Sequence, residues 1–148
     1  MKIRIDKYEN FVKMPNRAHD NDSGADVFAT ETFTIEPLSV VAHPLGFGVD
    51  LPDGYDIVLH CKSGLTKKGI FTLNPPVDSG YRTVYDENGN IVEKAEIHAM
   101  LFNSTKEPYT FNKGDKIAQL VIRPVIYADY VETRGENRGG GAFGSTGK

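Results

Sequence analysis

The segment 74–82 carries the residue types expected of a hydrolytic loop. It reads Asn-Pro-Pro-Val-Asp-Ser-Gly-Tyr-Arg, and its carboxylate is Asp78. Two prolines stiffen the backbone before Asp78, so the loop can hold this carboxylate where it orients and deprotonates a water molecule. Tyr81, three residues later, is placed to pack against a sugar. An Asp that only caps a turn is a commoner use of this residue type, so the segment alone leaves both interpretations open.

A second segment, 62–66, has the chemistry of an anion site. Lys62, Ser63 and Gly64 follow an apolar, strand-like run. A cation, a hydroxyl and exposed backbone N–H groups at a strand end can bind phosphate, although an ordinary exit from a strand into a turn explains the same residues. Gln119 is a further polar candidate, because it interrupts an apolar run. Asp26 is another. It ends the segment 22–26, whose residue types are also typical of a capped turn.

The composition changes near Thr133. Residues 133–148 are rich in glycine and contain one aromatic residue, Phe143. A disordered tail is the simple interpretation. The alternative is a tail that folds over a ligand, with Phe143 stacked on a flat ring and backbone N–H groups meeting phosphate oxygens. We therefore expect a β domain over residues 1–132 and a flexible C-terminal tail over residues 133–148.

Composition restricts the other classes of function. The chain has 148 residues, one cysteine and a net charge of −3, which fits one domain and argues against general nucleic-acid binding. The four histidines lack the spacing of zinc ligands, and no Gly-x-Ser-x-Gly elbow supplies a serine nucleophile. The first residues lack the apolar core of a signal peptide, and no apolar run approaches the roughly 20 residues that span a bilayer. A cytoplasmic protein is expected.

The elements that must position these residues are short strands. Fifteen glycines and eight prolines separate short apolar runs, which is typical of an all-β protein. Strands are predicted at residues 3–5, 27–29, 32–35, 40–41, 55–60, 70–73, 97–102 and 117–125. Residues 65–68 form at most one helical turn, and Asn88-Gly89 is predicted to close a hairpin. So many short strands favour a jelly roll or a related sandwich.

Five segments, in this order, resemble the five motifs of the trimeric dUTPase family. They are Ser-Gly-Ala-Asp-Val at 23–27, Lys-Ser-Gly-Leu-Thr-Lys-Lys-Gly-Ile at 62–70, Val-Asp-Ser-Gly-Tyr-Arg at 77–82, Phe-Asn-Lys-Gly-Asp-Lys-Ile-Ala-Gln-Leu at 111–120 and Arg-Gly-Gly-Gly-Ala-Phe-Gly-Ser-Thr-Gly at 138–147. The last is the most specific of the five. Their common order along the chain is much stronger than any single motif.

The resemblance implies a dUTPase-like jelly roll, a distorted β-barrel or sandwich, assembled as a homotrimer with active sites shared between subunits. It implies a dUTP diphosphatase that converts dUTP to dUMP and pyrophosphate with Mg²⁺ as its cofactor. This reaction limits uracil incorporation into DNA and supplies dUMP. The implied partner is therefore a small nucleotide, and neither nucleic acid nor a membrane is expected to bind directly.

The resemblance also implies roles for individual residues. Asp78 would be the general base whose water attacks the α-phosphorus, and Asp26 would hold a water molecule bound to Mg²⁺. Tyr81 would lie under the deoxyribose, where a ribose 2′-hydroxyl would clash. The other implied substrate-binding residues, which contact the phosphates or the uracil, are Lys62, Ser63, Gly64, Asn74, Gln119, Arg138, Phe143, Gly144, Ser145 and Thr146.

Three features depart from the family pattern. Lys62 stands where the family usually has arginine, which keeps the charge but loses the bidentate fork. Asn74 lies two residues closer to Asp78 than the corresponding asparagine of the family. Residues 83–96 look like an inserted hairpin beside the expected uracil pocket.

Two alternatives remain at this stage. dCTP deaminase is similar in fold, but it would carry a second serine at position 64 and a catalytic glutamate in the third region, where this chain has Gly64 and Asp78. An alternative of a different class is a binding or regulatory protein that uses the same fold as a partner surface. Turnover separates the two classes, because a binding protein releases no pyrophosphate.

Overall fold

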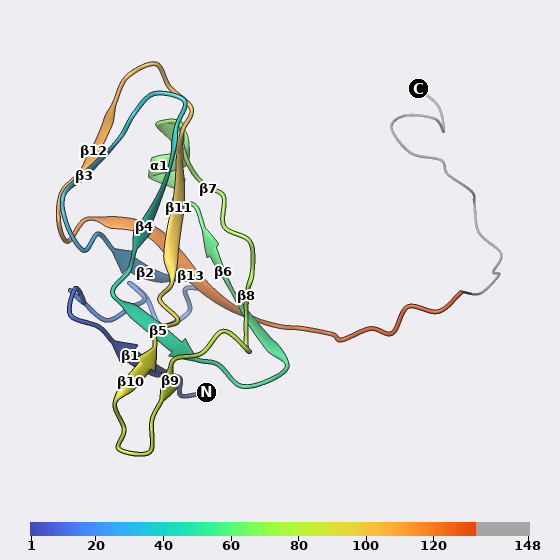
Figure 1. Ribbon diagram of the computed structural model, residues 1–148. Helices are drawn as coiled ribbons and strands as arrows, with labels where there is room; N and C mark the ends of the chain where they lie inside the picture. Colours follow the sequence, from blue (N-terminus) through green and yellow to red (C-terminus); the bar gives the residue numbers. More distant parts are fainter. Residues whose placement is uncertain (133–148) are drawn as a thin grey trace.

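The computed structural model describes residues 1–132 of the chain. These residues form thirteen strands and one short helix (Figure 1). The elements are β1 Arg4–Lys7, β2 Ala25–Phe28, β3 Phe33–Ile35, β4 Val40–Pro44, β5 Phe47–Asp50, β6 Tyr55–His60, α1 Ser63–Lys67, β7 Ile70–Thr72, β8 Val77–Asp78, β9 Val84–Tyr85, β10 Ile91–Glu93, β11 His98–Asn103, β12 Tyr109–Phe111 and β13 Lys116–Pro124. The predicted all-β class is confirmed for this part of the chain.

The strands pair in antiparallel ladders. A four-stranded sheet has the order β2-β13-β6-β8, and a three-stranded sheet has the order β4-β11-β7. Three two-stranded ladders complete the fold: β1 with β5, β3 with β12, and β9 with β10. Strand β13 is the longest and lies between β2 and β6, so it connects the first candidate motif to the second.

The core lies between these sheets. Alternate residues of β11 face inward, so that Ala99 and Leu101 are buried while Met100 is only partly buried, as a period of two requires. Ile57 of β6 and Ile117 of β13 are almost fully buried in the same cluster. Burial of this whole apolar cluster is the main force that holds the sheets together.

One buried polar cluster is structural. His43 is 2% exposed, and its Nε2 accepts a hydrogen bond from the backbone N–H of Thr30 at 3.0 Å. Its ring stacks on Phe33 with 3.9 Å between ring centroids. Burial lowers the pKa of His43, because removal from water disfavours the charged imidazole. His43 is therefore a satisfied core residue.

The predicted strands agree with the structure to different degrees. The strand at 55–60 is confirmed with the same bounds, and the expected hairpin over 83–96 is formed by β9 and β10. Gly89 adopts a positive φ of 81°, and its N–H bonds the carbonyl of Asp86. The predicted turn at Asn88-Gly89 is therefore confirmed.

Three strands were not predicted: β5, β8 and β12. In β5 the local signal is interrupted by Gly48, a residue type depleted in strands. A Cβ at Gly48 would lie 2.7 Å from the Tyr8 hydroxyl and 2.8 Å from the Ala95 carbonyl oxygen. The glycine is required by close approach of distant segments, which a local pattern does not reveal.

The described part of the chain contains no helix with the length and apolar character needed to cross a membrane. Its one helix, α1, has five residues. The sequence predicts at most one helical turn at 65–68, and the observed turn begins two residues earlier, at Ser63.

Candidate active site

The segment 62–66 forms a turn at the end of β6. The carbonyl of Lys62 accepts hydrogen bonds from the N–H groups of Leu65 and Thr66 and from the Thr66 hydroxyl. Leu65 is buried and anchors the turn, whereas Ser63 and Gly64 are exposed. Around an added Cβ at Gly64 there is no atom within 4 Å. The backbone at this position is therefore open to close approach by a ligand.

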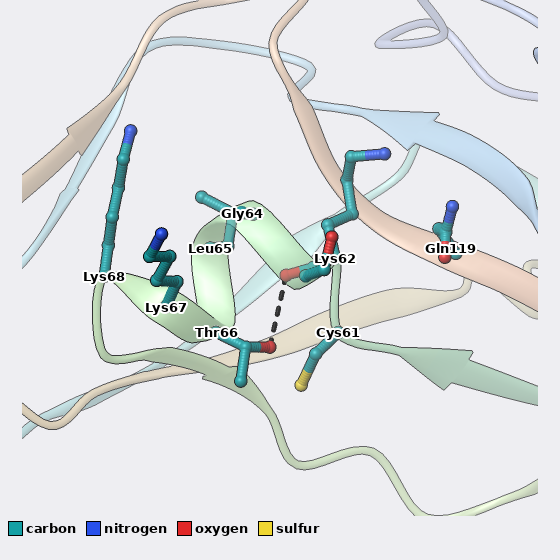
Figure 2. Close-up of a pocket in the computed structure, with 9 residues that line it drawn as sticks. Cys61, Lys62, Gly64, Leu65, Thr66, Lys67, Lys68 and Gln119 are labelled. Carbon is teal, nitrogen blue, oxygen red and sulfur yellow. Dashed lines mark hydrogen bonds between the residues drawn. The ribbon is translucent and has the colours of Figure 1, made fainter.

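A pocket of about 710 Å³ lies over this turn (Figure 2). The side chains of Lys62, Lys67 and Lys68 stand around it, and Gln119 lies across from the turn on β13. Three ammonium groups with exposed backbone N–H groups create an environment that suits a phosphate chain. The structure brings Lys62, Ser63, Gly64 and Gln119 together around one pocket.

Asp26 is joined to two lysines beside this pocket. Its side chain is 5% exposed, and its two oxygens lie 2.5 Å from Lys62 Nζ and 2.8 Å from Lys116 Nζ. Burial pushes the pKa of Asp26 upward, but the hydrogen bonds from Lys116 and Lys62 outweigh it and hold that pKa below its ordinary value. Asp26 therefore carries its negative charge at neutral pH.

Gln119 is placed by the strand register. It is paired with Asp26 of β2 on one side and with His60 of β6 on the other. A Cβ added at Gly24 would lie 2.9 Å from the Gln119 Cβ, closer than real Cβ contacts. The glycine of the first motif thus allows the segment before β2 to pass directly over Gln119.

The acidic groups beside this pocket determine what kind of metal contact the chain can offer. Among residues 1–132, no group of three or more His, Cys, Asp and Glu side chains could hold a metal ion. Mg²⁺ commonly keeps several waters and uses one or two carboxylates together with substrate phosphates. Asp26, a single ionised carboxylate beside the lysine-lined pocket, fits that kind of contact. The residues therefore fit a metal that arrives with a phosphate ligand.

Asp78 occupies the end of the short strand β8. It is exposed and lies directly opposite Asp56 of β6. Its carbonyl accepts a hydrogen bond from the N–H of Tyr81 at 3.0 Å, which closes a turn. Arg82 bonds the Ser79 carbonyl and lies 2.9 Å from Asp53 Oδ1. These hydrogen bonds therefore fix the loop that carries Asp78 both within itself and against Asp53.

Tyr81 and Asn74 border a second, smaller pocket of about 190 Å³. The Tyr81 ring is 47% exposed, and its hydroxyl donates to the Glu96 carbonyl at 3.1 Å. Asn74 donates to the His98 carbonyl at 2.7 Å and accepts from the Met100 N–H at 2.9 Å. Both ends of the Asn74 amide are thus used to hold the loop against β11.

Two residues that line this pocket, Glu96 and His98, are not indicated by the sequence motifs. Glu96 Oε1 accepts hydrogen bonds from Asn10 and from the Gly46 N–H, at 2.9 and 2.8 Å. The spacing of His98 from the other histidines does not mark it as a metal ligand. The signal that would have found it is the alternation in 97–102, because this places His98 on the face opposite the core.

The lysine-lined pocket lies over the turn that follows β6, whereas the loop beside the second pocket is paired near the start of that strand. Asp78 is opposite Asp56, near the start of that strand, whereas Lys62 follows its end. Six residues of extended backbone span roughly 20 Å. One copy of the chain therefore does not bring Asp78 to its own lysine-lined pocket.

The predicted tail residues lie outside the described part of the chain. These residues are Arg138, Phe143, Gly144, Ser145 and Thr146. Their implied contacts with the phosphates and the uracil stay predictions.

Comparison with known proteins decides the family. The sequence profile of the dUTPase family matches residues 10–147. The chain belongs to the dUTPase family. Its relatives include proteins named deoxyuridine 5′-triphosphate nucleotidohydrolase from Clostridium tetani, 36% identical over all of this chain and 97% of that protein, and from Alkaliphilus metalliredigens, 35% identical over 98% and 96%.

Solved dUTPase structures share the fold. A mutant of the Staphylococcus bacteriophage 80alpha dUTPase has a TM-score of 0.79 at 22% identity, covering 97% of this chain and 98% of that one. The 80alpha dUTPase with dUPNHPP has a TM-score of 0.74 at 24% identity, covering 99% of both. The predicted jelly-roll, dUTPase-like fold is thus confirmed.

Proposed function

We propose that this dUTPase-family chain hydrolyses dUTP to dUMP and pyrophosphate. The observation that carries the proposal is a pair of pockets with different linings. One is lined by lysines and by a turn with exposed backbone N–H groups, which suit phosphates. The other has a volume of about 190 Å³ and is bordered by Tyr81 and Asn74, and we assign it to the nucleoside. Relatives that cover nearly the whole chain are named as enzymes acting on deoxyuridine triphosphate.

The triphosphate end of the substrate would bind in the lysine-lined pocket, and the nucleoside end would bind beside Tyr81. Lys62 donates one ammonium hydrogen to Asp26, and an ammonium group has three donors, so two remain for phosphate oxygens. Ser63, Gly64 and Gln119 add neutral contacts around the same pocket. Tyr81 would lie against the deoxyribose, with its ring fixed by the hydrogen bond to the Glu96 carbonyl. In this arrangement a 2′-hydroxyl on the sugar would meet the ring.

Asp78 would act as the general base. The exposed carboxylate at the end of β8 would accept a proton from water, and this water would attack the α-phosphorus. The bond from that phosphorus to the bridging oxygen breaks, and pyrophosphate leaves. The lysine-lined pocket holds the leaving phosphates, whose negative charge grows during the reaction.

Mg²⁺ bound with the triphosphate would neutralise part of its charge and polarise its phosphoryl oxygens. Asp26 is the residue we assign to it, through a water molecule. The lysines that contact Asp26 also lower the cost of keeping this carboxylate ionised in a buried place.

We further propose that the active site is assembled from copies of the chain in a homotrimer. The separation of Asp78 from the lysine-lined pocket within one copy supports this, because the base and the phosphates must lie within one substrate's length. The tail residues Arg138, Phe143, Gly144, Ser145 and Thr146 would close the site over the phosphates and uracil.

The test is pyrophosphate release from dUTP, dCTP, dTTP and UTP, with and without Mg²⁺. Wild type should release it from dUTP in a Mg²⁺-dependent reaction. Asp78→Asn should lose about 10²- to 10⁴-fold in kcat while still binding a non-hydrolysable dUTP analogue. Release from none of the nucleotides would reject an enzyme and favour a binding protein, and deamination of dCTP would favour the deaminase.

Assembly is tested separately by light scattering and by mixing two inactive variants. Asp78→Asn and Lys62→Met affect different halves of the site. If the site is shared, mixed oligomers regain part of the activity, because some sites receive one intact half from each variant. A monomer with full activity would contradict the proposed sharing.

A further inference from the structure

A row of three charged residues crosses the sheet at Asp78. Arg123 of β13 is paired with Asp56 of β6, and Asp56 is paired with Asp78 of β8. Residues directly opposite on antiparallel strands point to the same face, with their Cβ atoms about 5 Å apart. The order across the face is therefore cation, anion, anion.

The first two members of the row are joined by a bidentate ion pair. Arg123 Nε and Nη2 lie 3.0 and 2.7 Å from the two oxygens of Asp56. The Asp56 side chain is 9% exposed, so its charge is poorly screened by water. The hydrogen bonds from Arg123 hold the pKa of Asp56 below its ordinary value, and Asp56 stays ionised.

We propose that Arg123 is a positioning residue that keeps Asp78 ionised by neutralising Asp56. This rests on the proposed role of Asp78 as the base. Without Arg123, the uncompensated carboxylate of Asp56 would stand directly opposite Asp78 on the neighbouring strand, and a nearby like charge disfavours ionisation. With Arg123 in place the pair is close to neutral, and Asp78 faces little repulsion from β6.

The other charged groups near Asp78 follow the same pattern. Asp53, in the turn before β6, accepts a hydrogen bond from the Ser79 hydroxyl at 3.2 Å. Its carboxylate is paired with Arg82 at 2.9 Å. Arg82 also lies 3.9 Å from Asp50 Oδ1, so the acidic side chains Asp50, Asp53 and Asp56 that flank the loop are all paired with arginines. The Asp53 pair is exposed, which leaves Asp56 as the more effective charge.

The row predicts opposite effects when Arg123 and Asp56 are replaced one at a time. Arg123→Gln leaves Asp56 unpaired, so the acidic limb of the kcat/KM profile should move to higher pH by about one unit. Asp56→Asn leaves Arg123 unpaired, so the same limb should move to lower pH. The double variant, Asp56→Asn with Arg123→Gln, should return close to the wild-type profile.

A purely structural ion pair would behave differently. Both single variants would then lose stability or total activity, with the limb in the same place. Arg123→Lys keeps the charge and should retain most of the wild-type profile even if it loses the bidentate geometry. Lys94→Gln is the control. It breaks the exposed ion pair between Lys94, in the hairpin segment, and Glu9. It changes the net charge by the same amount as Arg123→Gln and should leave the limb in place.

The experiment measures kcat/KM for dUTP from about pH 3.5 to about pH 8, a range that spans the ordinary pKa of an aspartate, on the full-length variants, with circular dichroism to confirm folding. If Asp56→Asn and Arg123→Gln shift the limb in opposite directions and the double variant restores it, the inference holds. If wild-type turnover depends on Asp78 but neither variant shifts the limb, the inference is overturned alone. If Asp78→Asn turns over normally, the proposed base fails, and this inference with it.

Discussion

The ammonium of Lys62 lies 2.5 Å from the buried carboxylate of Asp26, and that of Lys116 completes the cluster from the other side. The three residues come from the end of β6, from β2 and from the start of β13. The cluster therefore ties the first, second and fourth motifs together. It also fixes the position of the Lys62 ammonium, one of the cations of the lysine-lined pocket, before any ligand is bound.

Replacement of Asp26 should lower stability in a pH-dependent way. Because the folded-state pKa of Asp26 is lowered, its contribution is present above the ordinary pKa and is lost as the pH falls through the folded value. Asp26→Asn should cost about 1–3 kcal/mol in unfolding free energy at pH 7. The difference from wild type should shrink below about pH 4.

Urea titrations at pH 7, 5, 4 and 3 measure this difference. Asp50→Asn is the matched control, because Asp50 forms exposed ion pairs with Arg4 and Arg82, which contribute about 0–1 kcal/mol. A constant difference between Asp26→Asn and wild type across this range would contradict the ion-pair explanation.

Gly24→Ala should disturb the position of Gln119. The added Cβ would lie 2.9 Å from the Gln119 Cβ, so β2 or β13 must shift, at a cost of about 1–3 kcal/mol. Thermal unfolding measures the cost. Gly80→Ala is the control for stability, since an added Cβ there meets nothing within 4 Å. Equal melting temperatures for the two variants would show that the sheet absorbs the methyl group.

The hydroxyl and the ring of Tyr81 should have separable effects. Tyr81→Phe removes only the hydrogen bond to the Glu96 carbonyl and should lower kcat/KM for dUTP by up to about tenfold. Tyr81→Ala also removes the surface against the sugar, so the preference for dUTP over UTP should fall further. Steady-state kinetics with both nucleotides decide the matter: unchanged preference in Tyr81→Ala would mean that another group excludes ribose.

A partly buried hydrogen bond joins the inserted hairpin to Asp6 of β1. The Tyr85 hydroxyl lies 2.5 Å from Asp6 Oδ1, and Asp6 is 6% exposed. Tyr85→Phe leaves that carboxylate with only Arg4 as its partner and should cost about 1–2 kcal/mol in unfolding free energy. Val92→Thr, at an exposed hairpin position, is the control. Equal stability of both variants in urea would show that the contact adds nothing.

The sequence by itself determined the fold class, the family and the order of the candidate motifs. Residues 55–60 form the predicted strand with the same bounds, because a buried run of this length needs no distant information. The turn at Asn88-Gly89 likewise follows from the freedom of Gly89 to adopt a positive φ.

Tertiary structure alone decided which side chains meet. Nothing local in the sequence pairs Asp56 with Arg123 or Asp26 with Lys116, because those contacts depend on the register of strands far apart in the chain. A shift of one residue in that register would turn each side chain to the other face. The same register puts Asp78 and Lys62 at opposite ends of β6, which is the structural reason why one copy of the chain does not bring these two side chains together.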